Sequence, residues 1–154
     1  MKLFLGIILL IICVFIGYIK SNKYYYRRVF YEDFLRFNDK LKQEVAFKQC
    51  TIKSILDSEN IDTDFIACVK NVFLNNNEFS FNQSYLTENE IRYYSDYLSK
   101  IGVGDKSLQI NFLQSVNEEV GKIQNQCVSD EIKYKKLYIK LGFFIGLILL
   151  ILVL

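Results

Sequence analysis

The sequence lacks three residue types, and each absence limits what the protein can do. Among its 154 residues there is no histidine, no tryptophan and no proline. Histidine is the commonest general base and the commonest metal ligand, so the usual catalytic and metal-binding arrangements are missing. A glycine-rich phosphate loop and a nucleophile elbow are also absent. Because there is no proline, no residue of this kind breaks a long helix.

The acidic pairs and the cysteines do not indicate an active site. Glu118-Glu119 and Asp62-Asp64 lie among mixed charges, which is typical of solvated surface. No two cysteines form a C-x-x-C pair, and their spacing favours reduced, buried, small apolar residues: Cys13, Cys50, Cys68 and Cys127. The sequence therefore predicts a protein that is not an enzyme, with no catalytic, cofactor-binding or metal-binding residues and no small-molecule substrate.

What the chain has in excess is apolar sequence at its two ends. Leu3 to Ile19 is a charge-free apolar run, and Leu137 to Leu154 is a second one, broken only by Lys140. Lys2 supplies the charged start that a signal peptide would have, but no small-x-small cleavage site follows the first run, which favours an uncleaved anchor. We predict an anchor at residues 1–20, a cytoplasmic helical bundle at 21–136 and a second anchor at 137–154.

Basic residues predict the topology of these segments. They form a collar that flanks both apolar runs on the side of the middle segment: Lys20, Lys23, Arg27, Arg28, Lys133, Lys135, Lys136 and Lys140. The positive-inside rule then places the middle segment in the cytoplasm and both chain ends outside. The collar is expected to attract anionic lipid headgroups. All acidic residues fall between Glu32 and Glu131, and an acidic body argues against nucleic acid as a partner.

Helical periodicity divides the middle segment into an all-α bundle. Residues 25–49 carry an apolar stripe at Phe30, Phe34, Phe37, Leu41 and Val45, and continuity of this helix with the first anchor stays open. A short helix is expected at 51–57, and another begins after Asp62 or Thr63 with apolar positions Phe65, Ile66, Val69, Val72 and Phe73. Residues 79–86 read equally as a short aromatic helix or an ordered loop.

The next helix has clear boundaries. Thr87 and Glu90 form a capping box, and Gly102 is a C-terminal cap. The face between them carries Ile91, Tyr94, Leu98 and Ile101.

The last third of the chain predicts one long helix. Asp105 is a good N-cap residue directly after Gly104. The helix runs to Leu154, with apolar positions at Leu108, Phe112, Val116, Val120, Ile123 and Cys127 before the apolar tail.

Gly142 and Gly146 form a G-x-x-x-G pattern in the second apolar run. Small residues at this spacing let helix backbones approach closely. Two partners are possible for this face: the first anchor, which carries Gly6 and Gly17, or another protein.

Two stretches resemble the stage III sporulation protein AB family. The junction Ile101-Gly102-Val103-Gly104-Asp105, with Gln109 four residues later, resembles the family's L-G-x-x-D-x-x-x-Q signature. Residues 136–150, KLYIKLGFFIGLILL, are similar to the family's ending, which reads basic-tyrosine-lysine-L-G-x-x-x-G-L. Glu44-Val45 resembles the E-I that the family has near the end of its first helix. The chain departs from the family at Cys50-Thr51, where Thr-Pro is usual.

The resemblance implies a function that the residues alone do not. It implies a non-enzymatic platform or scaffold subunit of the secretion-like channel between mother cell and forespore, formed around engulfment. The soluble bundle would resemble the cytoplasmic domain of the type II secretion platform protein. The expected location is the outer forespore membrane, facing the mother-cell cytoplasm. The expected partners are the other stage III components, above all the secretion-type ATPase, and membrane lipids. The alternative is a membrane-anchored helical signalling or regulatory adaptor.

Overall fold

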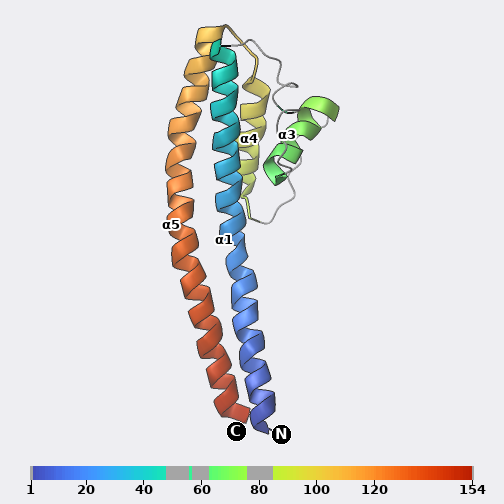
Figure 1. The fold of residues 1–154 in the computed structure, drawn as a ribbon, viewed down its shortest axis with the longest axis vertical. Coiled ribbons are helices and arrows are strands. Elements are labelled where there is room, and N and C mark those ends of the chain that lie inside the picture. The colour runs from blue at the N-terminus through green and yellow to red at the C-terminus, as the bar shows by residue number, and fades with distance from the viewer. Residues whose placement is uncertain (1, 48–55, 57–62, 76–84, 154) are drawn as a thin grey trace. The chain divides into compact units, whose positions relative to one another are not determined.

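The computed structural model describes residues 2–47, 56, 63–75 and 85–153. Within these ranges the chain forms helices and no strand, so the all-α prediction is confirmed. The helices are α1 (Lys2–Phe47), α3 (Asp64–Asn75), α4 (Glu88–Lys100) and α5 (Lys106–Val153) (Figure 1). The helix predicted at 51–57 lies outside the described residues except for Leu56, which is helical and fully buried.

The two outer helices are long and uninterrupted. α1 has 46 residues and α5 has 48, which correspond to lengths of about 69 and 72 Å at 1.5 Å per residue. The first anchor and the first helix of the bundle are therefore one helix. Both helices are long and apolar enough to cross a membrane. The prediction of apolar helices at both ends is confirmed.

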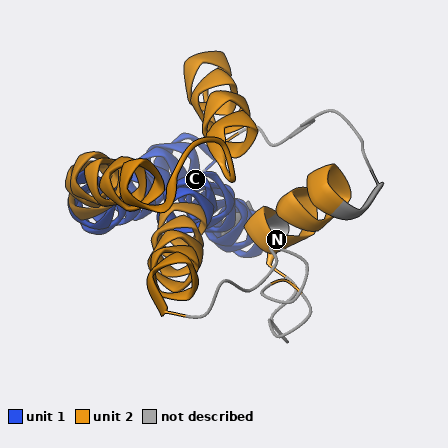
Figure 2. Cartoon of the chain, turned by 90° about the horizontal axis from the view of Figure 1, so that it is seen from above, with its two compact units in different colours: residues 1–28, 126–154 blue, residues 29–125 orange. Residues whose placement is uncertain are grey.

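The chain divides into two compact units (Figure 2). Unit 1 comprises residues 1–28 and 126–154, and unit 2 comprises residues 29–125. α1 and α5 each contribute residues to both units. The predicted segments 1–20, 21–136 and 137–154 stay predictions, because the two units follow internal packing and not the position of a bilayer.

Unit 2 has an aromatic core. Phe34 is fully buried, and its ring centroid lies 4.8 Å from that of Tyr97, 5.1 Å from that of Tyr94 and 5.3 Å from that of Phe65. These edge-to-face contacts join α1 to α3 and α4 through one side chain. Aliphatic residues of α5 complete the buried set: Leu113, Val116 and Val120. The core thus rests on ring packing, which needs defined orientations as well as apolar area.

Most predicted stripes are buried, but the one on α5 is displaced at its start. Leu108 was predicted to face the core, and its side chain is 62% exposed. Gln109 is 5% exposed instead, and the buried series continues through Leu113, Val116 and Val120. One residue turns a helix by about 100°. Because the Gln109 side chain is drawn inward, Leu108 lies at the solvent-facing edge.

Capping side chains begin the two short helices as the sequence indicated. Thr63 precedes α3, and its hydroxyl accepts a hydrogen bond from the Ile66 N–H at 3.5 Å. Thr87 and Glu90 form the predicted capping box of α4. Of residues 79–86 only Tyr85 and Leu86 are described, in a turn and a bend.

Candidate functional site

The junction between α4 and α5 is a tight turn built on two glycines. Gly102 has a φ of 79° and Gly104 a φ of 99°, both in the left-handed region that side chains disfavour. A Cβ added at Gly102 would meet nothing within 4 Å. The glycine is therefore required by backbone conformation and not by crowding, which agrees with its predicted place just past the end of α4.

Asp105 and Gln109 close the turn with side-chain hydrogen bonds. The Asp105 carboxylate accepts from the Leu108 N–H at 2.7 Å, as an N-cap of α5 should. The Gln109 side-chain oxygen accepts from the Gly102 N–H at 3.0 Å. This bond reaches back across the turn and holds the buried Gln109 against the end of α4. The four residues singled out in the sequence thus meet in one structural motif.

Exposed apolar residues gather around this turn. In unit 2, the large apolar side chains that are exposed among the described residues are Phe47, Val103 and Leu108, at 85%, 67% and 62%. The Lys106 ammonium donates to the Ala46 carbonyl oxygen at 2.7 Å, so the end of α1 lies beside the start of α5. Figure 1 shows these two helix ends next to each other. We call Phe47, Val103 and Leu108 the tip patch.

Unit 1 is packed on glycines. A Cβ built on Gly142 would lie 2.7 Å from the Cys13 carbonyl oxygen, and one on Gly146 would lie 2.9 Å from the Leu10 Cα. On α1, a Cβ at Gly17 would lie 2.6 Å from the Tyr138 carbonyl oxygen. Real Cβ atoms are not found this close to backbone atoms, so only glycine permits the approach. Of the two partners open to the G-x-x-x-G face, the structure shows the first anchor of the same chain.

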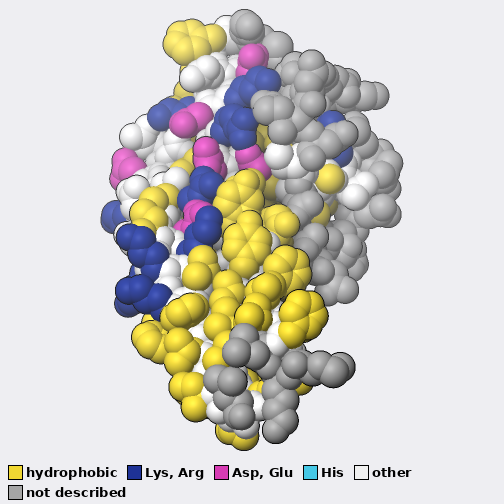
Figure 3. All heavy atoms as spheres, turned by 60° about the horizontal axis from the view of Figure 1, so that its bottom comes forward, with side chains coloured by type: hydrophobic (Ala, Val, Ile, Leu, Met, Phe, Trp, Pro, Cys, Tyr) yellow, Lys and Arg dark blue, Asp and Glu magenta, His cyan; other side chains and the backbone are white. Residues whose placement is uncertain are grey.

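The outer surface of α1 and α5 on either side of this glycine seam is apolar. Large side chains of unit 1 point outward from both helices, including Phe4 at 72% and Phe144 at 60% exposed. Figure 3 shows apolar side chains gathered over the ends of α1 and α5, with basic side chains at the border of that area. Such an exposed apolar surface on tightly packed helices is typical of a membrane-spanning pair.

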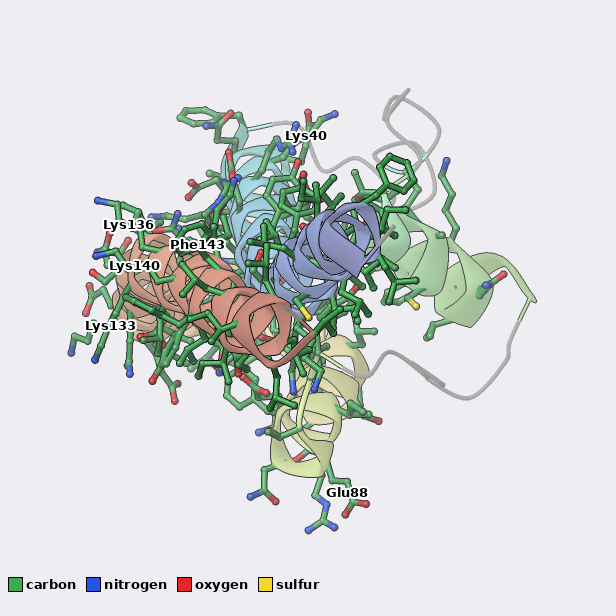
Figure 4. The ribbon with its side chains drawn as sticks, turned by 90° about the horizontal axis from the view of Figure 1, so that it is seen from below. Lys40, Glu88, Lys133, Lys136, Lys140 and Phe143 are labelled. Carbon is green, nitrogen blue, oxygen red and sulfur yellow. The ribbon has the colours of Figure 1, made fainter. Side chains whose placement is uncertain are left out.

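The basic collar lies entirely within unit 1, and its members differ in their contacts. Arg28 pairs with Glu131 at 2.5 Å and lies 5.3 Å from the Tyr25 ring centroid. Lys133, Lys136 and Lys140 are exposed and point outward from α5 (Figure 4). Lys20, Lys23 and Lys135 are also exposed, and Arg27 is half-buried. Arg28 is therefore partly neutralised, and the exposed lysines carry most of the accessible charge.

Tyrosines join the two helices beside the collar. The rings of Tyr24 and Tyr134 are stacked at 4.5 Å, and Tyr138 lies 6.1 Å from Tyr24. Tyr24 therefore bridges α1 and α5.

A buried polar network in unit 2 was missed by the sequence analysis. The fully buried Asn38 amide donates to the Leu113 carbonyl oxygen at 2.8 Å and to Asn117 at 2.7 Å. Its oxygen accepts from the Tyr97 hydroxyl at 2.8 Å. Burial raises the pKa of Tyr97 above its usual range, so this hydroxyl stays a donor. Asn38 lies four residues after Phe34 and therefore on the same apolar face of the helix. A polar residue at such a position is the signal that could have revealed the network.

The described side chains offer no evident chemistry. No three of the cysteine, aspartate or glutamate residues in the described ranges come together to hold a metal ion. Cys127 is buried, as predicted for a small apolar residue, whereas Cys13 and Cys68 are only half-buried. Cys50 lies outside the described residues. What the structure brings together are a capped turn, a tip patch, a glycine seam and a basic collar, all of which serve packing or contact.

Comparison with known proteins identifies one family. The family model described as stage III sporulation protein AB matches residues 2–154. Neither the curated proteins nor the solved structures include a match to the chain. The expected likeness of the bundle to the type II secretion platform domain therefore stays a prediction.

Proposed function

Because the chain belongs to the stage III sporulation protein AB family, we propose that it is a scaffold subunit of a secretion-like membrane channel between mother cell and forespore. Membership implies a role in stage III sporulation. Within that role, the subunit positions other components and carries out no reaction of its own.

The observation that carries this proposal is the continuity of α1 and α5. Each helix forms one side of the glycine seam in unit 1 and contributes residues to the core of unit 2. Neither helix is interrupted between the two units. A short linker would let a membrane anchor and a soluble bundle move independently. Two continuous helices instead join a unit suited to a bilayer to a unit with a protein-binding surface without a separate linker, as expected of a scaffold subunit.

The proposed location is the outer forespore membrane, with unit 2 in the mother-cell cytoplasm. The basic collar supports this orientation through the positive-inside rule. The test is labelling in intact cells of a Ser95→Cys variant, in which the four native cysteines are replaced by serine. Ser95 is an exposed residue of α4. Protection from an impermeant maleimide until the cells are opened is expected, and labelling of intact cells would reverse the orientation.

The proposed partner is the secretion-type ATPase of the complex, and the tip patch is its contact. Exposed apolar residues scattered singly need no explanation, but three at one end of a bundle mark an interaction site. They surround the capped turn, whose hydrogen bonds hold Val103 and Leu108 in place. The family signature then serves the partner indirectly, because it fixes the shape of the surface.

The experiment is co-purification of the full chain with the ATPase from sporulating cells, together with a spore count. Val103→Asp with Leu108→Asp is expected to abolish both co-purification and sporulation. The matched control adds the same charge elsewhere on unit 2, as Ser95→Asp with Asn125→Asp at exposed positions, and should behave as wild type. If the wild-type chain retains a kinase or regulator and no channel component, the signalling adaptor is correct instead.

A further inference from the structure

A furrow beside the glycine seam in unit 1 has an apolar part and a polar part. The apolar part is a groove of about 410 Å³, lined by Leu10, Ile11, Val14, Phe15, Tyr18 and Ile139. The polar part is a recess of about 220 Å³, lined by Tyr18, Ser21, Asn22, Tyr25, Tyr26 and Lys135. Tyr18 lines both, and Lys135 lies one helical turn from Ile139 on α5. The two parts therefore adjoin.

The dimensions of the furrow match a chain with a polar head. Leu10 to Tyr18 spans about 12 Å of α1, and Tyr18 to Tyr26 spans a similar length. The apolar stretch is less than half of a hydrocarbon core of about 30 Å. The volume of the groove falls within the range of about 300–1,000 Å³ that is usual for small-molecule sites.

The recess presents donors and one positive charge. The side chains of Lys135 and Asn22 make no hydrogen bond or ion pair in the part of the chain that the structure describes. The Ser21 hydroxyl donates to the Tyr18 carbonyl oxygen at 2.7 Å and is thereby held in place. The tyrosine hydroxyls and the Asn22 amide are further donors, and none of the lining residues is acidic. Such a recess is complementary to a phosphate group.

Lys135 differs in this respect from its neighbours in the collar. Lys133 and Lys136 point outward from α5 (Figure 4), and Lys140 borders a separate, apolar groove of about 400 Å³. Lys135 faces tyrosines and an asparagine of α1 across the recess. Basic pockets between transmembrane helices on the cytoplasmic side bind the headgroups of anionic lipids.

We propose that this furrow binds one anionic glycerophospholipid, with an acyl chain in the apolar groove and the phosphate beside Lys135. The proposal rests on the membrane placement proposed above. A zwitterionic lipid would bring its own ammonium group toward the Lys135 ammonium, so the site prefers a lipid with net negative charge. The bound lipid would cover the side of the seam where the apolar groove adjoins a recess that holds both a lysine and hydroxyl and amide donors.

The test uses the absence of tryptophan from the chain. A Phe15→Trp variant of the full chain places a single tryptophan in the groove. The protein is reconstituted in phosphatidylcholine vesicles that contain either brominated phosphatidylglycerol or brominated phosphatidylcholine. We expect brominated phosphatidylglycerol to quench the tryptophan about fivefold more effectively per molecule, the factor that one lysine near a membrane surface provides.

Two controls separate a site from general attraction. Leu141→Trp places the reporter at a similar depth, beside the seam glycine Gly142, but outside the groove, and should show the weaker preference of the collar as a whole. In the Phe15→Trp background, Lys135→Gln should remove the extra preference and Lys136→Gln should keep it. Equal quenching by both lipids at position 15, or equal loss in the two lysine variants, would overturn the site.

Failure of the membrane placement has a different signature. If neither brominated lipid quenches tryptophan at position 15 or at position 141, the helices are not in the bilayer, and both this proposal and the membrane scaffold are wrong. Quenching at both positions with no lipid preference would overturn the lipid site alone and leave the scaffold in place.

Discussion

Units 1 and 2 share two helices, α1 and α5, but differ in where glycines and aromatic rings lie. In unit 1 the closest contacts between α1 and α5 are made at glycines, tyrosines stack beside them, and phenylalanines such as Phe144 are exposed. In unit 2 phenylalanines and tyrosines are buried where α1 packs against α3 and α4, and aliphatic residues of α5 complete the core. Phenylalanine is therefore a core residue in unit 2 and an exposed residue in unit 1.

The difference reflects the solvent that each unit is suited to. In water, burying rings removes apolar area from the solvent and stabilises the fold. In lipid there is no such gain, because the surroundings are as apolar as the side chains, and association depends on close backbone approach. One helix can therefore follow one packing rule along its stretch in unit 1 and another along its stretch in unit 2.

The largest effect is expected from filling the glycine seam. Gly142→Leu with Gly146→Leu would place side chains where the α1 backbone lies within 3 Å. We expect normal membrane fractionation, because leucine favours insertion, but a loss of sporulation as α1 and α5 separate. Gly121→Leu is the matched control on the same helix, since a Cβ there meets nothing within 4 Å. Normal spore counts in the double variant would show that the seam does not matter for function.

A second test makes the same type of substitution, phenylalanine to alanine, once in each unit. Phe34→Ala removes the ring at the centre of unit 2 and should cost about 3–5 kcal/mol. Phe144→Ala removes a ring that is 60% exposed in unit 1, and should change stability by less than about 0.5 kcal/mol. Thermal unfolding of the full chain in detergent, followed by circular dichroism, measures both. Similar losses for the two variants would contradict the division into two packing rules.

The buried network of unit 2 should have an intermediate effect. Asn38→Leu leaves the buried Tyr97 hydroxyl without its acceptor, at a cost of about 1–3 kcal/mol. Adding Tyr97→Phe to Asn38→Leu should cost less than the sum of the single changes, because it removes a donor that is already unsatisfied. Asn111→Leu, at an exposed position of α5, is the control in the same unfolding measurement. Simple additivity would show that the hydrogen bond contributes nothing.

The smallest effects are expected at the turn. Asp105→Ala removes the N-cap of α5 and should cost about 0.5–2 kcal/mol. Gly102→Val forces a side chain into a left-handed conformation, at about 1–2 kcal/mol. Each kilocalorie corresponds to a melting temperature lower by about 2–4 °C for a chain of this size. If neither variant melts earlier, the signature acts only through partner contact.

Local patterns were read correctly where a single helix decides the outcome. The capping box at Thr87, the end of α4 before Gly102 and the length of α5 all follow from hydrogen bonds and propensities within a few residues. The helix face that turns inward was predicted less well, because it depends on the neighbours. Leu108 was wrongly predicted to be buried. The hydrogen bond from the Gly102 N–H to the Gln109 side chain joins the end of α4 to α5, and the apolar pattern of α5 alone does not reveal it.

By itself the sequence determined an all-α chain with two apolar ends, two long helices and a capped turn, because helical periodicity, caps and the lack of proline act locally. Only the tertiary structure decided which surfaces meet. It paired Gly142 with Cys13 on α1, buried Asn38 against Leu113, and left Phe47 beside the turn that carries Val103 and Leu108. Such contacts join residues far apart in the chain, and several partners would satisfy the same pattern equally well before the helices are placed in space.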